Sequence, residues 1–124
     1  MPDEKQVIPK GPKGIVMTVK QFAENFGFPP VCIPDSEREI KGAYIGDLLS
    51  WVMGKANADN AWITIMSNIN IVAVASLADL SCIILAEGVT LDEDVRNAAE
   101  AKGINVLSSE KAAFEIATII SGAV

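Results

Sequence analysis

The fold is decided by residues 61–90, which read AWITIMSNINIVAVASLADLSCIILAEGVT. Two short apolar runs, 61–66 and 82–85, have the residue types of buried strands. The segment 68–80 lies between them, and its β-branched residues by themselves would favour a third strand. The assignment of this middle segment therefore determines whether the sheet is antiparallel or parallel.

We predict a helix over 68–80. A pair of parallel strands needs a crossover element between its members, and a helix is the usual one. The segment also contains one helical stripe of apolar residues, made of Ile69, Val72, Ala73, Leu77 and Leu80.

The same alternation continues to the end of the chain. The T-x-x-E spacing of Thr90 and Glu93 is that of a capping box, and it predicts a helix that ends at Gly103. Residues 104–107 then form a third strand, and Ser108 or Ser109 caps a last helix. This second half is β-α-β-α-β-α. We therefore predict a single α/β domain with a largely parallel sheet flanked by helices.

The first half contains a second set of elements. A capping box at 18–21 opens a helix that stops at Gly27, and strands are predicted over 31–33 and 40–45. Asp47 is predicted to cap a helix that buries Leu48, Leu49 and Val52, with Trp51 as a further candidate. Residues 1–14 are rich in proline, glycine and charge, which predicts a flexible tail before a folded domain at 15–124.

Composition excludes several classes of function. The 124 residues carry a net charge of −6, so nucleic acid and anionic membranes are not expected as partners. The polar residues 1–14 predict no signal peptide, and no apolar run in the sequence reaches membrane length. Cys32 and Cys82 lie in apolar runs and are interpreted as buried, reduced thiols, with a disulfide between them as the alternative. We expect a cytoplasmic protein.

Motifs for catalysis are absent from the sequence. It has no histidine, no phosphate-binding glycine loop, no G-x-S-x-G and no cysteine pair at zinc spacing. The acidic run 92–94 could hold a divalent cation, but negative charge in the first turn of a helix is the simpler explanation. We therefore expect no enzyme activity, no cofactor and no metal.

A candidate ligand site follows from the predicted topology. Ligands of open parallel sheets bind beyond the carboxyl ends of the strands, where three polar loops should meet and helix amides are free. Glu87 opposes an anionic ligand there. The alternative is that these residues are ordinary caps and turn residues. The candidates are Ser67, Asn68, Asn70, Glu87, Gly88 and Thr90, with Ser108 and Ser109 in the third loop.

Surplus apolar residues predict an interface. Ile71 and Val74 fall outside the stripe of the helix at 68–80, and Phe114 and Ile119 fall outside the inner face of the last helix. A two-fold interface would bury them, which favours a homodimer. Alternatively, they fill the second layer of the fold.

The chain resembles the DRTGG domain family. The resemblance covers residues 15–122, and it is carried by AYIGDLLSWVM (43–53), WITI (62–65), NIVAVASL (70–77) and IILAEG (83–88). It is closest to the small stand-alone members that are similar to the amino-terminal domain of HPr kinase/phosphorylase. Related domains occur in phosphotransacetylase-like proteins and beside CBS domains in pyrophosphatases. The resemblance implies an α/β fold, self-association and a regulatory role.

The sequence departs from the motif that names the family. Ser67-Asn68-Ile69 stands where Gly-Asp-Arg is common, and Ala86-Glu87-Gly88 stands where Thr-Gly-Gly is common. Recognition of a ligand through that arginine is therefore not expected. We expect a non-catalytic regulatory or assembly module that acts as a homodimer. The alternative is a sensor that binds a small metabolite or a nucleotide at the carboxyl ends of the strands.

Overall fold

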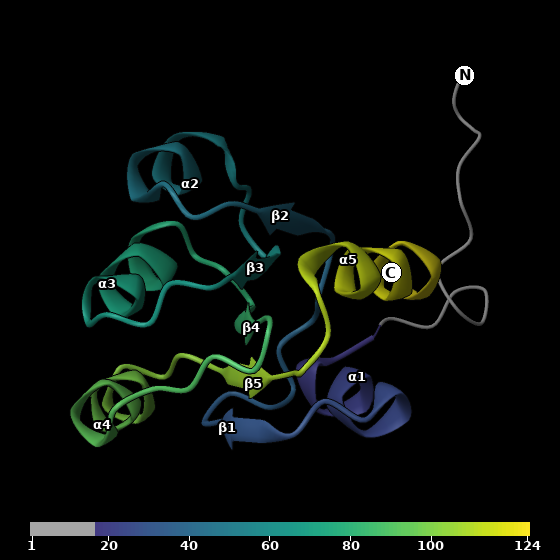
Figure 1. Cartoon of the computed structure of the whole chain (residues 1–124), viewed down its shortest axis with the longest axis horizontal. Coiled ribbons are helices and arrows are strands. Elements are labelled where there is room, and N and C mark those ends of the chain that lie inside the picture. Colours follow the sequence, from purple (N-terminus) through teal and green to yellow (C-terminus); the bar gives the residue numbers. More distant parts are fainter. Residues whose placement is uncertain (1–16) are drawn as a thin grey trace.

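The computed structural model describes residues 17–124, which form a five-stranded sheet with helices on both faces (Figure 1). The strands are β1 (Pro30–Cys32), β2 (Ala43–Ile45), β3 (Ala61–Thr64), β4 (Cys82–Leu85) and β5 (Val106–Ser108). The helices are α1 (Val19–Phe26), α2 (Leu49–Lys55), α3 (Asn70–Leu77), α4 (Glu93–Ala101) and α5 (Ala113–Ala123). The predicted tail at 1–14 and the domain boundary at 15 lie outside the described residues.

The strand order is β1-β5-β4-β3-β2. Strands β2 to β5 are parallel, and only β1 runs antiparallel, at the edge beside β5. Each parallel pair is joined by one crossover helix, so the predicted β-α-β-α-β-α order of the second half is confirmed. The predicted α/β class and largely parallel sheet are confirmed as well.

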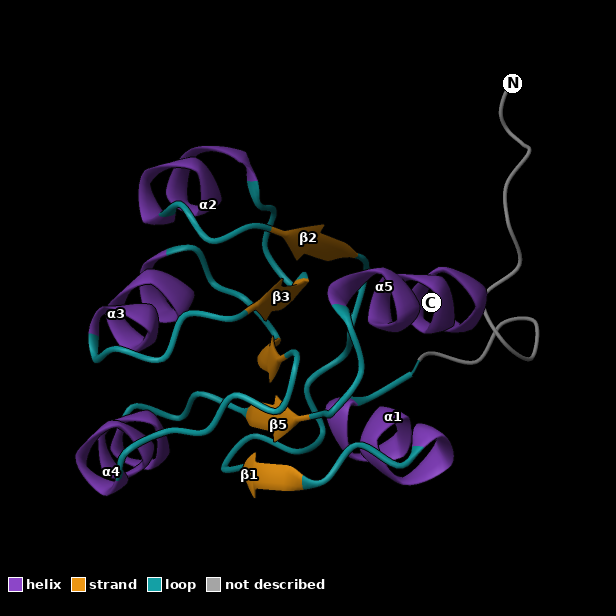
Figure 2. Ribbon diagram, in the orientation of Figure 1, coloured by secondary structure: helices purple, strands orange, loops and turns teal. Residues whose placement is uncertain are grey.

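Helices α1 and α5 cover one face of the sheet, and α2, α3 and α4 cover the other (Figure 2). Neighbouring residues of a strand therefore enter different cores, because successive side chains point to opposite faces. Trp62 and Ile83 pack beneath α2, α3 and α4, whereas Ile63 and Ile84 pack beneath α1 and α5. Every residue of β3 and β4 is buried, which explains why all of them except Thr64 are apolar.

Helix α1 begins and ends as its sequence predicts. Thr18 Oγ1 accepts a hydrogen bond from the Gln21 amide at 3.1 Å, and Gln21 Oε1 accepts one from the Thr18 amide at 3.0 Å. Gly27 ends the helix in the left-handed conformation, with φ at 72°. Phe22 is fully buried on the inner side, with its ring 4.9 Å from that of Phe28.

Three other predicted helix caps are corrected by the structure. Asp47 precedes α2 but makes no cap, and α2 begins after Leu48. Helix α4 begins after Asp92 rather than at Thr90, and α5 begins after Ala112 rather than after Ser108 or Ser109. The loops that follow β4 and β5 are thus longer than predicted, because their backbone groups bond to each other before each helix starts.

Helix α3 is confirmed, and Val72 and Leu80 of its predicted stripe are buried, but the other three members of the stripe are exposed. Leu77 is 73% exposed and Ile69 is 48% exposed, although both belong to that stripe. Ile71 and Val74 are instead buried in the core, so they are not available for the expected interface. The reason is the position of α3 between α2 and α4, which buries a wide arc of its surface in addition to the side that faces the sheet.

Helix α2 buries less than its sequence predicts. Only Val52 is buried, Leu49 is partly covered, and Leu48 and Trp51 are each 56% exposed. This helix packs over the edge strand β2, where no further element covers its outer side among the described residues. Within residues 17–124, no helix is long and apolar enough to cross a membrane.

Candidate functional site

The four parallel strands end at one edge of the sheet, which we call the carboxyl edge. The loops that leave β3, β4 and β5 there contain the predicted ligand-binding residues, except that Asn70 is the first residue of α3. The structure brings only some of these residues together. The β4 and β5 loops are joined to each other, whereas the β3 loop stands apart from them.

A pocket of about 280 Å³ lies between the β4 and β5 loops. We call it the β4–β5 pocket. Of the predicted residues it contains Gly88 and Thr90, together with the third-loop residues Ser108 and Ser109. Val89 also lines it, between Gly88 and Thr90, and the sequence interpretation missed the other four lining residues, which are Gly27, Pro29, Glu110 and Lys111.

The missed residues have two different origins. Gly27 and Pro29 reach the pocket because β1 pairs antiparallel with β5, which no local sequence signal indicates. Glu110 and Lys111 were assigned to the last helix, although they precede it. The only available signal was their position between Ser109 and the next apolar run.

Backbone hydrogen bonds tie the two loops of the pocket together. The Glu87 amide donates to the Lys111 carbonyl at 2.9 Å, and the Gly88 amide donates to the Ser109 carbonyl at 2.8 Å. Both donor residues have positive φ, at 62° and 74°. These amides are therefore already used by the fold and are not free to bind a ligand.

The backbone amides at the start of α5 are also largely occupied by hydrogen bonds within the chain. Ser109 Oγ accepts a hydrogen bond from the Lys111 amide at 2.9 Å, and Glu115 Oε1 accepts one from the Ala112 amide at 3.1 Å. The Lys111 ammonium is the cation of the pocket lining, and Glu110 is its anion. This set suits a small, polar ligand better than a polyphosphate, because one lysine offsets little of a multiple negative charge.

Gly88 is required by the geometry of the pocket. A Cβ at this position would lie 2.7 Å from Glu110 Oε1, and φ at 74° is strained for any other residue. We expect Gly88→Ala to lower the free energy of unfolding by about 1–2 kcal/mol. Gly54→Ala is the control, because it lies within α2 and its Cβ would meet nothing within 4 Å. That control should instead raise stability by roughly 0.5–1 kcal/mol, and urea unfolding measures both. Equal effects of the two variants would contradict the assignment.

The β3 loop resembles an ordinary turn. Asn68 Oδ1 accepts a hydrogen bond from the Asn70 amide at 2.8 Å, which is a local contact that needs no ligand. Ser67, Asn68 and Asn70 are exposed and do not line the β4–β5 pocket. For these three residues the structure favours the turn interpretation.

Asp47 joins β2 to β3 at the carboxyl edge. Its Oδ1 accepts hydrogen bonds from Thr64 Oγ1 at 2.7 Å and from the Ile65 amide at 3.0 Å. The side chain thus fixes the β2 loop against the end of β3 instead of capping α2.

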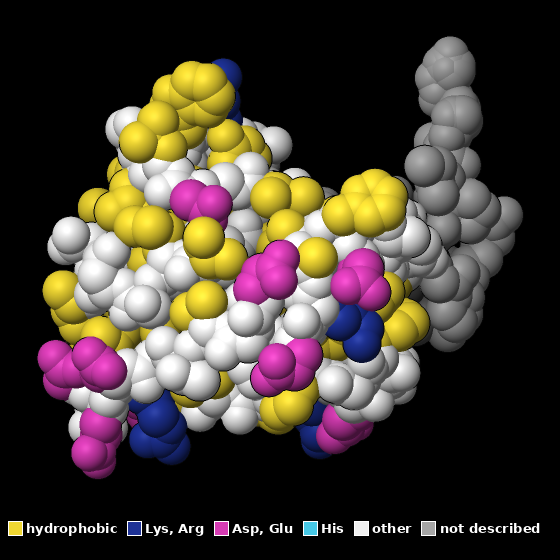
Figure 3. All heavy atoms as spheres, viewed as in Figure 1, with side chains coloured by type: hydrophobic (Ala, Val, Ile, Leu, Met, Phe, Trp, Pro, Cys, Tyr) yellow, Lys and Arg dark blue, Asp and Glu magenta, His cyan; other side chains and the backbone are white. Residues whose placement is uncertain are grey.

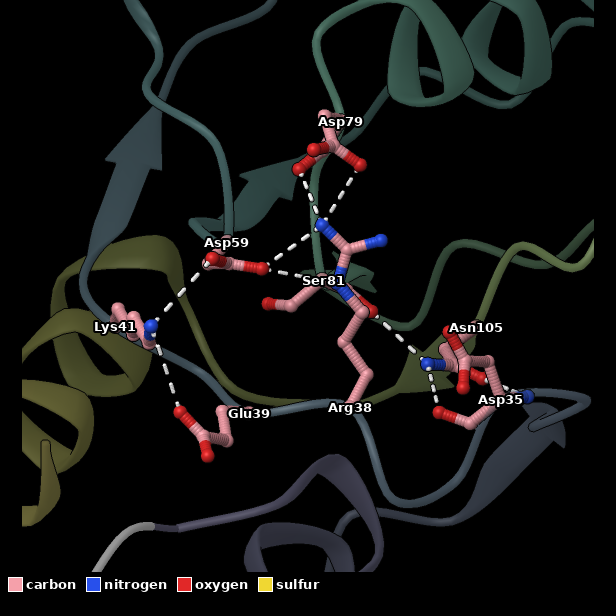
Figure 4. A network of polar contacts seen from close by, with 8 residues as sticks. All are labelled: Asp35, Arg38, Glu39, Lys41, Asp59, Asp79, Ser81 and Asn105. Atoms are coloured by element: carbon pink, nitrogen blue, oxygen red, sulfur yellow. Dashed lines mark hydrogen bonds and ion pairs between the residues drawn. The ribbon is translucent and has the colours of Figure 1, made fainter.

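The opposite edge of the sheet holds an ionic network around Arg38 (Figure 4). Arg38 Nε and Nη2 donate to Asp59 Oδ1 at 3.0 and 2.8 Å. Nη2 also donates to the Asp79 carbonyl at 2.7 Å and to Asp79 Oδ1 at 2.8 Å. Burial alone would lower the pKa of Arg38, but the hydrogen bonds and charges of Asp79 and Asp59 outweigh it and raise the pKa. This arginine therefore stays charged and joins three loops.

Asn105 extends the network toward β1. Its Nδ2 donates to the Ser81 carbonyl at 2.9 Å and to the Asp35 carbonyl at 2.8 Å, while its Oδ1 accepts from the Asp35 amide at 2.9 Å (Figure 4). Asn105 is almost fully buried, so these bonds offset the cost of placing its amide in the core. The contacts of the network hold together loops of the same chain. The Ser81 hydroxyl beside them is buried and has no hydrogen-bond partner among the described residues.

Neither cysteine is placed for chemistry. Both are free and buried, and burial raises the pKa of Cys82 to about 12 from its usual 9.0. Because the folded pKa is above the unfolded value, the stability that this thiol contributes is present below pH 9 and is lost as the pH rises toward 12. Within residues 17–124, no three metal-binding side chains gather at one point.

We expect Cys82 to resist alkylation by iodoacetamide at pH 8 in the folded protein and to react fully in urea. The thiolate is the reactive form, and burial suppresses it. Mass spectrometry of the alkylated peptides measures the modified fraction at each cysteine. Rapid labelling of Cys82 without denaturant would show that β4 opens in the folded state.

Comparison with known proteins identifies the family. The DRTGG domain model matches residues 36–123, which is most of the chain. The chain belongs to the DRTGG domain family. The matched residues begin after β1, so α1 and β1, and with them Gly27 and Pro29 of the pocket, lie outside the part that defines the family.

A solved structure shares the fold. It is the crystal structure of the CBS and DRTGG domains of the regulatory region of Clostridium perfringens pyrophosphatase, complexed with the activator diadenosine tetraphosphate. The TM-score is 0.67 and the sequence identity is 13%. The match covers 82% of this chain and 44% of that one, so this DRTGG chain spans less than half of that structure. No curated protein matches the chain.

Proposed function

We propose that this DRTGG-domain chain is a non-catalytic regulatory or assembly module that acts as a homodimer. Its support is an exposed apolar surface near the carboxyl edge, on the side of β2. Six large side chains form this apolar surface, each at least 48% exposed: Ile45, Leu48, Trp51, Ile65, Ile69 and Phe114. Hydrophobic side chains gather over α2, over α5 and across the surface between them (Figure 3).

Exposure at this level is costly for a chain that remains alone in water. Phe114 is 80% exposed, and burying a side chain of this size contributes about 1.5–3 kcal/mol. Contiguous apolar surface on a small domain marks a site of association. The net charge of −6 disfavours self-association elsewhere on the molecule, because like charges repel.

We expect Phe114→Glu to convert the dimer into monomers without loss of folding, because the side chain makes little contact within its own chain. Light scattering coupled to size exclusion should give twice 13.1 kDa for the native protein and 13.1 kDa for the variant. Leu77→Glu is the matched control, since Leu77 is 73% exposed but lies at the far end of α3. The control should remain dimeric. A native protein that is monomeric at every concentration would contradict the proposal.

The β4–β5 pocket supports a second candidate, a sensor of a small metabolite or nucleotide. Its volume, its Thr90 and Ser109 side chains and its single lysine suit a small polar molecule. The structure that shares this fold was solved with a nucleotide activator, which makes nucleotides the first ligands to try.

We expect a ligand of the pocket to raise Tm in proportion to the logarithm of its concentration, because it binds only the folded state. Adenosine, AMP and diadenosine tetraphosphate are the probes. Lys111→Ala should abolish a rise caused by the charged probes and spare one caused by adenosine. No rise with any probe at millimolar concentration would exclude a nucleotide sensor and leave the assembly role in place.

A further inference from the structure

We infer that two copies of this chain join through the free edge of β2, so that their sheets become continuous. The inference rests on the proposed homodimer and assigns its interface. Strand β2 is the last strand of the sheet, and no strand pairs with its outer edge among residues 17–124 (Figure 1).

The hydrogen bonds to β3 show which backbone groups of β2 face outward. The Gly42 carbonyl accepts from the Ala61 amide at 2.9 Å, and the Gly46 amide donates to the Ile63 carbonyl at 3.2 Å. Gly42, Tyr44 and Gly46 therefore face β3. Because successive residues alternate, Ala43 and Ile45 each present an N–H and a C=O to the outside.

A second copy of β2, running antiparallel, satisfies all of these groups. With the two-fold axis at Tyr44, Ala43 lies opposite Ile45 of the partner subunit, and such a pair exchanges two hydrogen bonds. The symmetry repeats the pair on the other side of the axis. A partner of different sequence could offer the same backbone groups, but charge favours a second copy.

Charge complementarity follows from the same register. Two residues beyond each end of the paired strands, Lys41 lies opposite Asp47 of the partner subunit. Both side chains are exposed on their own chain. The Lys41 ammonium lies 3.6 Å from Glu39 Oε1 and 3.9 Å from Asp59 Oδ2, and Asp47 is bonded to the end of β3 through its Oδ1. Between these two residues the sequence 42–46 carries no charged side chain, and neither does the part of α5 from 116 to 123. Opposite charges at both ends of an uncharged strand fit an antiparallel copy of the same strand.

The surface beside the free edge of β2 is apolar as well. A groove of about 340 Å³ runs between β2 and α5, and it is lined by Gly42, Ala43, Ile45, Ala117, Ile120, Ser121 and Val124. Ile45 is 48% exposed within it. Pairing of the strands would bring the groove of each copy to the interface, and it would continue the apolar surface that contains Ile45 and Phe114.

The test compares Ile45→Pro with Ile45→Val. Proline removes the outward N–H and is tolerated at a free edge, whereas valine keeps that donor and, like proline, has a smaller side chain than isoleucine. We expect Ile45→Pro to weaken the dimer about tenfold or more by analytical ultracentrifugation, because one donor is lost from each copy. Ile45→Val should stay close to the native dissociation constant.

A second pair of variants tests the same edge without changing β2. Ser121→Glu on α5 puts a charge from each copy into the groove, and it should also weaken the dimer about tenfold. Asn97→Glu adds the same charge on α4, which covers the other face of the sheet, and it should have no effect. Circular dichroism verifies that each variant is folded.

Amide exchange of the native protein gives an independent measurement. The Ala43 and Ile45 amides should exchange more slowly as the protein concentration rises, and the amides of edge strand β1 should not change. A native protein that is monomeric throughout would overturn both this assignment and the homodimer. A dimer that survives Ile45→Pro and Ser121→Glu, with exchange at these amides unchanged, would overturn only the assignment to β2.

Discussion

Replacing Trp62 with alanine is expected to lower the free energy of unfolding by about 3–5 kcal/mol, which is a large part of the total for a domain of this size. Trp62 is fully buried at the centre of the core beneath α2, α3 and α4. Its Nε1 also donates to the Gly46 carbonyl at 2.8 Å, so the substitution leaves both a cavity and an unpaired acceptor.

Trp62→Phe separates these two contributions. It keeps most of the apolar volume and removes the hydrogen bond to Gly46, so we expect a loss of about 1–2 kcal/mol. Guanidinium unfolding followed by circular dichroism measures both variants. Equal losses for alanine and phenylalanine would show that the hydrogen bond, rather than the packing of the indole ring, holds β2 against β3.

Replacing Arg38 with alanine is expected to lower the free energy of unfolding by about 2–3 kcal/mol. The side chain is 23% exposed, and its main partner Asp59 is 29% exposed, so water screens their contact only partly. The contact with Asp79 contributes less, because that carboxylate is 68% exposed. Asp59 and Asp79 both have positive φ, so loss of the arginine also removes the group that holds these two strained turns.

Arg38→Lys should recover less than half of this loss. A lysine has a single ammonium group and cannot reach both carboxylates as the guanidinium does with Nε and Nη2. Thermal unfolding at low salt and at 1 M salt measures the effect. The difference in Tm between the native protein and the variants should be only modestly smaller at 1 M salt. Full recovery by lysine would mean that only the charge is needed at this position.

The candidate site was predictable in part. The sequence placed Gly88, Thr90, Ser108 and Ser109 at the carboxyl edge, because strand order along the chain and helix crossovers determine where parallel strands end. It did not place Pro29 in the pocket, since β1 reaches β5 only through a long-range antiparallel pairing. It also assumed free helix amides, whereas the Glu87 and Gly88 amides bond to the β5 loop.

The predicted interface residues were also only partly correct. Phe114 is exposed as expected, but Ile71 and Val74 are buried and Ile119 is half-buried. Helical periodicity locates one buried face, and it cannot reveal how many neighbours a helix has. Helix α3 has α2 on one side and α4 on the other, whereas α2 has a neighbouring helix on one side only among residues 17–124.

The sequence by itself determined the fold class, the helix within 68–80 that connects two parallel strands, and the absence of a catalytic motif. These depend on residue type and on local periodicity. Only the tertiary structure decided which polar groups at the carboxyl edge remain unused, which apolar residues stay exposed and which strands lie at the edges of the sheet. These properties depend on contacts between segments far apart in the chain. No local pattern in a sequence encodes the identity of such neighbours.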